Sequence, residues 1–381
     1  MDKTRSSCHK FQDVMIKNRI ASLDLLRFIS VILVMYGHFV LVGGGATVIP
    51  GVIADGIALP LIDNSIWGFW KFETLLVETF HTQSAVLGVT LFFMITGYLI
   101  PTMRERYSRK AFLVNRCLRI FPVLIAGTLI IGLFLHFAQG IDFPLSSYLG
   151  SWTLSYLIFG VVPVSGVLWT LIVEVIFYVI ALLMGCFTVY RLMLLYTVLI
   201  AVILVFRTFP DYAHFALAAT QAKFLLMILV GSAVFLAERE EKWRWKLALI
   251  GASLMISYMG FQLFNLSQLD TSTYTNFGTS LLALGLFLTI QKTSSAGWIT
   301  RLPIIISWLA DLAYPIYIVH VAFGFATMAL VRCLSPNPYI MLAAAMVISI
   351  VVSAALHLCV ELPGIALGRE IAKRIDGATR I

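Results

Sequence analysis

Charged residues are scarce in this chain: only 12% of its 381 residues are Asp, Glu, Lys or Arg, whereas 60% are hydrophobic. That balance leaves no room for a sizeable soluble domain beside the apolar segments. Many of the apolar runs are long enough to cross a bilayer as helices. The composition therefore predicts an all-α, polytopic membrane helix bundle.

The chain also lacks paired cysteines, internal repeats and linker-like segments. Its five cysteines form no Cys-x-x-Cys motif. Cys8, Cys117, Cys186 and Cys359 are expected at cytoplasmic helix ends, and Cys333 near the outer face. Because no two of them share the oxidising side, neither a disulfide nor a zinc site is expected, and no metal is assigned. The absence of linkers favours a single domain.

About ten transmembrane helices are predicted, in one domain over residues 20–360. A cytoplasmic segment, 1–19, precedes this domain, and a cytoplasmic tail, 361–381, follows it. The expected spans are 20–42, 84–103, 113–137, 167–188, 190–207, 221–237, 246–264, 276–291, 311–333 and 339–360.

Lysines and arginines gather at one end of these helices, and the opposite loops contain little more than Lys71, Arg207, Lys223 and Arg332. By the positive-inside rule, both termini face the cytoplasm from an inner membrane. The net charge of +8 reflects this topology, and no nucleic-acid partner is expected. Residues 43–46 resemble a signal cleavage site, but the first apolar run is longer than a usual signal, so an uncleaved span is predicted.

Three connections are longer than turns. Residues 43–83 are aromatic around positions 67–70 and predict an interfacial helix or a lid. Residues 139–166 contain an apolar stretch that is too short to span, so it is either re-entrant or flat on the surface. Residues 295–310 predict an interfacial helix on the cytoplasmic side.

The first span contains three ionisable residues, Asp24, Arg27 and His38. Such groups are expensive in hydrocarbon, so they indicate a functional site that faces the protein interior. Arg27 and His38 lie about three helical turns apart, which places them on one face and roughly 16 Å apart along the axis. Asp24 is one turn from Arg27 and can neutralise it. The pattern predicts a ligand track that runs from a charged end to a titratable imidazole.

Arg116 and Arg119 lie one turn apart at the cytoplasmic start of the third span. Two guanidiniums can donate bidentate hydrogen bonds to phosphate oxygens, which suits a phosphate-bearing ligand. The alternative is that they anchor the helix and bind lipid headgroups. Pro122, one turn further along, predicts a kink or an opened first turn.

The fourth span places Trp169 at the outer interface and Glu174 one to two turns deeper, at the expected depth of His38. A carboxylate beside an imidazole can orient it and stabilise its protonated form. The alternative is an ion pair between Glu174 and an intramembrane arginine.

The ninth span opens with Asp311, a second carboxylate available to the arginines. Tyr314, Tyr317 and His320 follow it at intervals of three residues on one helical face. His320 is predicted to be a hydrogen-bonded packing residue rather than a second catalyst. No role is assigned to His81, His136, His214 or His357.

Together these residues resemble the motifs of the acyltransferase family 3 integral-membrane proteins, bacterial enzymes that acylate glycans and other hydroxyl-bearing acceptors. The resemblance spans most of the chain, with every motif in family order. It points to the stand-alone form, without a fused SGNH-type domain. Asn115, Thr96 and Leu124 depart from the common pattern, and the first removes one phosphate contact. The matching residues are Leu23, Asp24, Arg27 and His38; Leu91–Tyr98; Arg116, Arg119 and Pro122; Trp169, Glu174, Phe177 and Tyr178; and Tyr314, Tyr317 and His320.

The resemblance implies an O-acyltransferase that uses acyl-CoA, most often acetyl-CoA, as co-substrate, with no tightly bound cofactor. It implies a glycan acceptor, such as lipopolysaccharide or its lipid-linked precursor, with membrane lipid as the other partner. Donor binding falls to Arg27, Arg116 and Arg119. Catalysis falls to His38, as general base or acylated nucleophile, together with Glu174. Supporting roles fall to Asp24, Trp169, Tyr178, Tyr314, Tyr317, His320 and Asp311.

Two other classes of function compete with this interpretation. A proton-coupled transporter would use Arg27, His38 and Glu174 as an ion relay, and broken helices in matched halves would favour it. A flippase or polymerase of lipid-linked glycans would need large, arginine-rich outer loops, which the sequence lacks. The motifs leave open the acceptor, the acyl chain and the choice between direct transfer and an acyl-enzyme.

Overall fold

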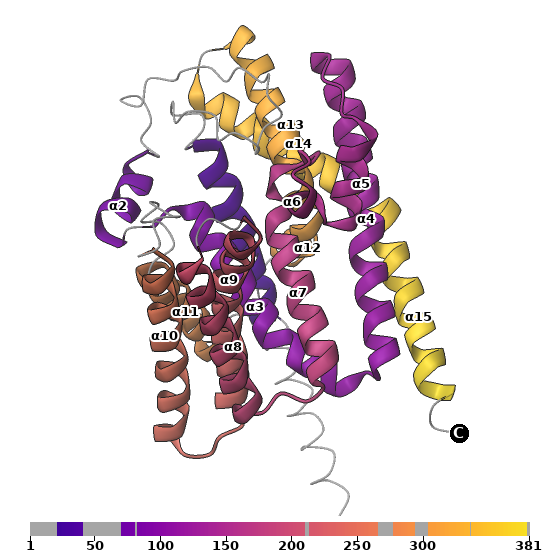
Figure 1. Cartoon of the computed structure of the whole chain (residues 1–381). Coiled ribbons are helices and arrows are strands. Elements are labelled where there is room, and N and C mark those ends of the chain that lie inside the picture. Colours follow the sequence, from indigo (N-terminus) through magenta and orange to yellow (C-terminus); the bar gives the residue numbers. More distant parts are fainter. Residues whose placement is uncertain are drawn as a thin grey trace, which may run out of the picture.

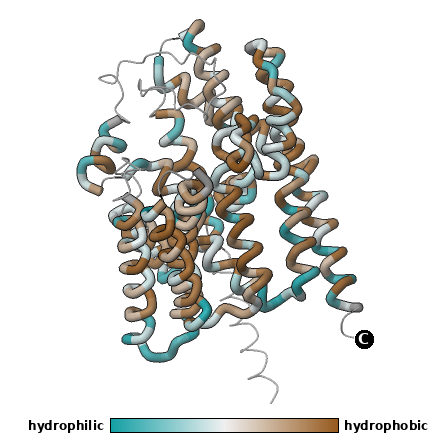
Figure 2. Tube along the Cα trace, in the orientation of Figure 1, coloured by the Kyte–Doolittle hydropathy of each residue, from teal (hydrophilic) through white to brown (hydrophobic). Residues whose placement is uncertain are grey.

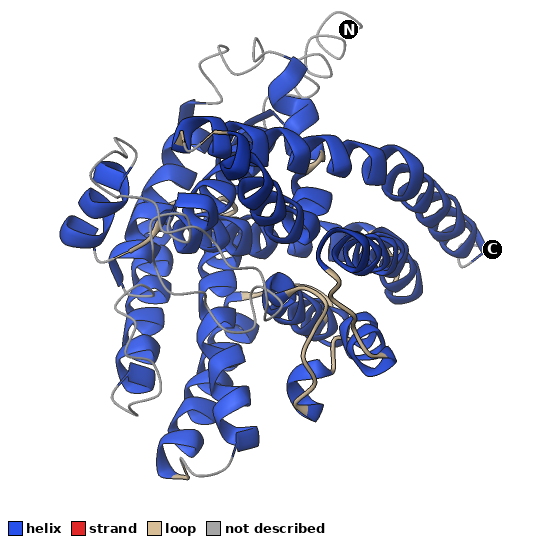
Figure 3. Cartoon of the chain, turned by 90° about the horizontal axis from the view of Figure 1, so that it is seen from above, coloured by secondary structure: helices blue, strands red, loops and turns tan. Residues whose placement is uncertain are grey.

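The fold is helical throughout the part of the chain that the computed structural model describes (Figures 1 and 3). No β-strand occurs among these residues, which confirms the predicted all-α class. The predicted segment 1–19 lies outside them. The described residues are 21–40, 70–80, 82–209, 213–265, 277–293, 304–335 and 337–378.

Nine of the described helices are long and apolar enough to cross a membrane. Hydrophilic residues gather at helix ends, as in the turn between α9 and α10 (Figure 2). The remaining predicted span, the eighth (276–291), forms α11 (Phe277–Thr293), a helix of 17 residues and therefore about 25 Å long. The nine are the first described helix (Ala21–Val40, here the first helix), α3 (Ser84–Arg106), α4 (Arg109–Gln139), α7 (Trp169–Met184), α8 (Val189–Thr208), α9 (Ala213–Ala237), α10 (Trp243–Asn265), α13 (Ala313–Leu334) and α14 (Pro338–Leu356) with its continuation.

The predicted position of Lys223 in an outer loop is wrong. Lys223 lies within α9, which begins at Ala213, and only 2% of its surface is exposed. Its Nζ is 4.8 Å from the ring centroid of Phe224 and 4.4 Å from that of Phe264, so aromatic faces stabilise the buried charge. The predicted span begins at residue 221 and so places Lys223 at the outer end of the helix, whereas α9 begins at Ala213 and carries Lys223 about three turns inside.

The connection over 139–166 is re-entrant. It contains α5 (Leu145–Thr153) and α6 (Tyr156–Phe159) and leads to a short 3₁₀ turn, η2 (Gly166–Leu168). Trp152 Nε1 donates to Thr128 Oγ1 of α4 at 2.9 Å. Tyr156 packs in a buried cluster with Ile120 and Leu124, which lie near the middle of α4. These contacts bring the segment back against the middle of α4, as the re-entrant alternative predicts.

The C-terminal range predicted as a tail continues the last helix instead. α14 passes through a π-helical turn, η5 (His357–Glu361), into α15 (Leu362–Ala378), which packs along α4 (Figure 1). Pro122 lacks an N–H and so leaves the Leu118 carbonyl without its helical donor. Gly364 approaches that carbonyl closely, since a Cβ added there would lie 2.6 Å from its oxygen. This contact, which a hydropathy profile cannot reveal, lets α15 pack closely on α4.

Two of the predicted interfacial helices are partly described. α2 (Trp70–Phe80) covers the end of 43–83, and residues 41–69 lie outside the described part. α12 (Ile304–Asp311) covers the end of 295–310, whereas 294–303 are not described.

Candidate active site

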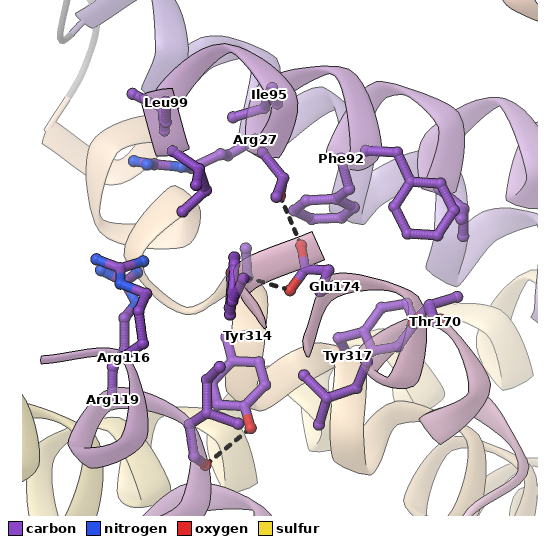
Figure 4. A pocket seen from close by; sticks show the side chains of 18 of the residues that line it. Arg27, Phe92, Ile95, Leu99, Arg116, Arg119, Thr170, Glu174, Tyr314 and Tyr317 are labelled. Atoms are coloured by element: carbon purple, nitrogen blue, oxygen red, sulfur yellow. Dashed lines mark hydrogen bonds between the residues drawn. The ribbon is translucent and has the colours of Figure 1, made fainter. Parts of the chain in front are cut away.

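A cavity of about 1140 Å³, including its open mouth, lies between α3, α4, α7, α13 and the first helix. Residues from all of these elements line it, so its shape depends on how the helices pack. In the close-up view, arginines occupy one side, Glu174 lies in the middle, and Phe92, Thr170 and Tyr317 form the other side (Figure 4).

All three arginines predicted to bind the donor line this cavity. Arg27 reaches it from the first helix and forms the predicted ion pair with Asp24, at 2.9 Å. Arg116 and Arg119 reach it from adjacent turns of α4 (Figure 4). Arg116 donates to Met103 Sδ at 2.9 Å. Within the described residues, neither Arg116 nor Arg119 has a carboxylate at ion-pair distance.

Glu174 belongs to this cavity and not to His38. Its carboxylate accepts from Thr96 Oγ1 at 2.6 Å and from the Tyr178 hydroxyl at 3.4 Å. The Tyr178 ring lies 5.8 Å from the guanidinium carbon of Arg116. The expected pairing of Glu174 with His38 is therefore wrong. Position along the helix suggests a shared depth, but the direction in which α7 faces is not visible in the sequence.

The two tyrosines of α13 donate hydrogen bonds to backbone carbonyls of α4 and of η2. Tyr314 donates to the carbonyl of Ile120 at 2.9 Å, and Tyr317 donates to the carbonyl of Val167 at 3.2 Å. Both line the cavity, as does Asp311. The Tyr317 ring meets Phe92 edge-on, with centroids 6.4 Å apart. Trp169 instead packs on Phe224 and Phe93, outside the cavity lining.

His38 contacts His320, the residue predicted to be a hydrogen-bonded packing residue. His38 Nδ1 and His320 Nε2 are 3.0 Å apart, and His320 is fully buried. Gly324, one turn further along α13, leaves room for Phe39 and lets the first helix approach. The His320 ring is also 5.9 Å from that of Tyr317, so Tyr317 separates the cavity from this histidine pair.

A second histidine contact was missed because His357 received no role. His357 Nδ1 lies 2.7 Å from Glu361 Oε2 across the π-turn η5, and both side chains are buried. The i, i+4 spacing of a histidine and a glutamate within an apolar run was the available signal. π-turns often mark functional sites, and this one packs against α4, which carries Arg116 and Arg119.

The helix α2 is tied to the beginning of α3 by Glu73, which is 1% exposed. Its carboxylate accepts from the Ser84 backbone N–H at 3.2 Å and from the Ser84 hydroxyl. Burial raises the pKa of Glu73 above its ordinary value, although both hydrogen bonds oppose that shift. Phe72 of the same helix meets Tyr36, two residues before His38, at a ring separation of 5.8 Å. The helix therefore covers the His38 end of the first helix.

The chain is similar to known acyltransferases. A family model described as an acyltransferase domain matches residues 20–358. The chain is also similar to Nodulation protein 10 of Rhizobium leguminosarum bv. viciae, with 32% identity over 132 residues. That alignment covers 29% of this chain and 34% of the relative, so the chain spans about a third of the relative's length. No solved structure matches the chain.

Proposed function

This chain belongs to the family of acyltransferases defined by that domain, and we propose that it moves an acetyl group from cytoplasmic acetyl-CoA to a hydroxyl of a cell-surface glycan or of its lipid-linked precursor. It does so as an integral protein of the inner membrane, with both termini in the cytoplasm.

The observation that carries this proposal is a pair of arginines, Arg116 and Arg119, that have no carboxylate at ion-pair distance within the described residues. Arg116 and Arg119 line a cavity among membrane-spanning helices, where an uncompensated charge costs several kcal/mol. An anion that enters the cavity would remove that cost. The phosphates of CoA fit the requirement, because each guanidinium offers a planar pair of donors to phosphate oxygens. Arg27, already paired with Asp24, would complete the group.

The shape of the cavity supports a small, uncharged acyl group. Beyond Glu174, Phe92, Thr170 and Tyr317 line the cavity, and none of them is basic (Figure 4). The apolar part suits the pantetheine arm, which would bring the thioester to the Phe92 and Tyr317 end of the cavity, where these rings leave room for a short acyl group next to the histidine pair. A charged acyl group such as succinyl would have no counter-charge there.

In the proposed reaction, His38 acts as the general base on the acceptor hydroxyl. The hydroxyl oxygen forms a bond to the thioester carbonyl carbon while its proton passes to His38. The carbon–sulfur bond then breaks, and the proton on His38 passes to the departing thiolate, so that free CoA thiol is released. Glu174 orients the donor side through Tyr178 and Arg116 and takes no part in the proton transfer.

Among the residues that the structure describes, no contact favours the ion-relay alternative. Glu174 hydrogen-bonds Thr96 and Tyr178, and the hydrogen-bonded chain from His38 runs through His320 to backbone carbonyls. A carbonyl accepts a hydrogen bond but carries no proton onward, so this chain ends inside α13.

The test is binding of CoA to the purified protein in detergent, together with slow hydrolysis of acetyl-CoA. Replacing Arg116 or Arg119 by Ala should weaken CoA binding by about tenfold to a hundredfold, because a charge-assisted hydrogen bond contributes about 1.5–3 kcal/mol. Arg109→Ala is the matched control, since Arg109 is exposed at the start of the same helix and outside the cavity lining.

His38→Ala distinguishes the contribution of the site to CoA binding from its contribution to catalysis. It should retain CoA binding and lose at least about a hundredfold in acetyl-CoA hydrolysis. If wild-type protein neither binds CoA nor hydrolyses acetyl-CoA, or if Arg109→Ala weakens binding as much as Arg116→Ala, the proposed function is wrong.

A further inference from the structure

The two histidines form a short chain of hydrogen bonds with a defined end. His320 Nδ1 lies 2.9 Å from the carbonyl oxygen of Ile316 and 3.0 Å from that of Tyr317. His320 Nε2 lies 3.0 Å from His38 Nδ1. The His320 side chain has no exposed surface, whereas His38 retains some.

These contacts determine which nitrogen atoms carry hydrogen. A carbonyl oxygen only accepts, so Nδ1 of His320 must be the N–H donor. A fully buried imidazole surrounded by carbonyls and an imidazole, with no carboxylate among these partners, is neutral, so Nε2 of His320 holds a lone pair. The contact at 3.0 Å then requires the N–H to be on Nδ1 of His38. The Val34 carbonyl, one helical turn earlier, also accepts a hydrogen bond from His38, and in a helix a carbonyl four residues earlier is reached from Nδ1. With the N–H on Nδ1, Nε2 of His38 holds the lone pair.

We propose that His320 is a positioning residue for the transferase reaction: it fixes the tautomer and the ring orientation of His38 so that Nε2 of His38 is the atom that takes the acceptor proton. This assignment rests on the proposed function. It places the second histidine of the site behind the base, in the position that a carboxylate occupies behind the histidine of serine hydrolases.

The neutrality of His320 gives this pair a property that a carboxylate would not supply. When His38 becomes protonated, its Nδ1–H donates a stronger, charge-assisted bond to His320. The proton has no further partner beyond His320, because Nδ1 of His320 is already bonded to carbonyls. The proton therefore stays on His38, where the departing thiolate can collect it.

Two amide substitutions separate positioning from packing. In His320→Gln, the amide oxygen would reach the place of Nε2 and still accept from His38. In His320→Asn, the shorter side chain would reach only the place of Nδ1 and bond the carbonyls. We expect His320→Asn to lower the kcat of acetyl-CoA hydrolysis about a hundredfold. The glutamine variant should remain within roughly tenfold of wild type, and both should bind CoA within about twofold of wild type.

A packing role gives the opposite order, because Asn preserves the carbonyl contacts that hold α13. Equal activity of the two variants, or higher activity of His320→Asn, would overturn the proposal. If the wild-type protein neither hydrolyses acetyl-CoA nor binds CoA, the proposed function itself is wrong. That outcome is therefore distinct from a failure of the role proposed for His320.

A measurement on the unmodified sequence removes the dependence on variant folding. In protein labelled with ¹⁵N-histidine, with His38→Ala used to assign the resonance, the neutral His38 ring should carry its proton on Nδ1. The tautomer protonated on Nε2, which is the usual form of free histidine, would contradict the assignment.

Discussion

Arg116 and Phe92 sit at opposite ends of one cavity and select different parts of a ligand. Within the described part of the chain, the guanidinium of Arg116 hydrogen-bonds a thioether and an amide oxygen, so its charge is available to an anion. Phe92 offers only a ring edge, packed against Tyr317, whose hydroxyl is fixed on the Val167 carbonyl. Of these two rings, Phe92 is the one that can be removed without loss of a hydrogen bond, and we expect its bulk to limit the acyl chain.

Phe92→Ala should extend the range of donors that the site accepts. Removing the ring opens the end of the cavity, and a methylene in an apolar pocket is worth about 1–3 kcal/mol. We expect the ratio of butyryl-CoA to acetyl-CoA hydrolysis to rise by roughly tenfold or more. Leu99→Ala is the control, because Leu99 lines the same cavity from the same helix near the arginines (Figure 4). An unchanged ratio in Phe92→Ala would mean that another residue sets the chain length.

Helices that carry site residues are held in place by contacts far from those residues. The helix α4 presents Arg116 and Arg119 on one side and packs against α15 through Gly364 and Gly368 on another. The first helix presents His38, and α2 covers that end through Phe72 and Tyr36. A change at either packing contact should therefore alter the site without touching it.

Gly364→Ala should displace α15 from α4. Its Cβ would lie 2.6 Å from the Leu118 carbonyl oxygen, so the backbones must separate, at a cost of about 1–3 kcal/mol. We expect a lower melting temperature in detergent and weaker CoA binding. Gly377→Ala, in the same helix but with nothing within 4 Å of its added Cβ, should leave both unchanged or slightly improved. Equal effects of the two substitutions would show that the contact with α4 is unimportant.

Glu73→Gln should stabilise the protein increasingly as pH rises. Because burial raises the pKa of Glu73 in the folded state, the folded protein binds its proton more tightly than the unfolded chain does. The contribution of Glu73 to the free energy of unfolding is thus highest at pH values below its pKa in the unfolded chain. It is lost as the pH rises through the pKa of Glu73 in the folded protein. Each tenfold difference in acidity corresponds to about 1.4 kcal/mol.

Gln keeps one oxygen to accept from the Ser84 backbone N–H, its NH2 group can donate to the Ser84 hydroxyl oxygen, and it carries no charge, so it avoids this loss. Melting temperatures at pH 4 and pH 8 provide the measurement. Glu73→Ala, which removes the acceptor from the end of α3, should be less stable than Gln at both values by about 1 kcal/mol. A Gln variant that is less stable than wild type at pH 8 would show that the ionised carboxylate is favourable there.

The whole molecule combines a helical bundle with a re-entrant segment that holds one side of the cavity. Residues 145–168 contact the middle of α4 and include Val167, whose carbonyl accepts a hydrogen bond from the Tyr317 hydroxyl. The arginines lie near the end of the bundle where α3 meets α4, and the histidine pair lies toward the end covered by α2. Such an arrangement offers separate approaches for a donor and an acceptor on the two sides of a membrane.

Cysteine labelling tests this orientation. The exposed Cys186 follows α7, and the exposed Cys333 lies near the end of α13. In single-cysteine variants, a membrane-impermeant maleimide added to intact cells should label Cys333 and leave Cys186 unlabelled until the membrane is permeabilised. The reverse pattern would place the arginine cavity on the outer side and contradict a cytoplasmic donor.

Hydropathy and charge bias were sufficient to predict the helices, because the bilayer constrains each span separately and locally. The same local pattern predicted the ion pair between Asp24 and Arg27. It also predicted that the three arginines share one site, because ionisable groups in a membrane face the protein interior. Which interior partner each group meets depends on the rotation and packing of helices that are distant in sequence. Only the tertiary structure therefore paired His38 with His320 in place of Glu174, buried Lys223 inside α9, and turned the expected tail into a helix on α4.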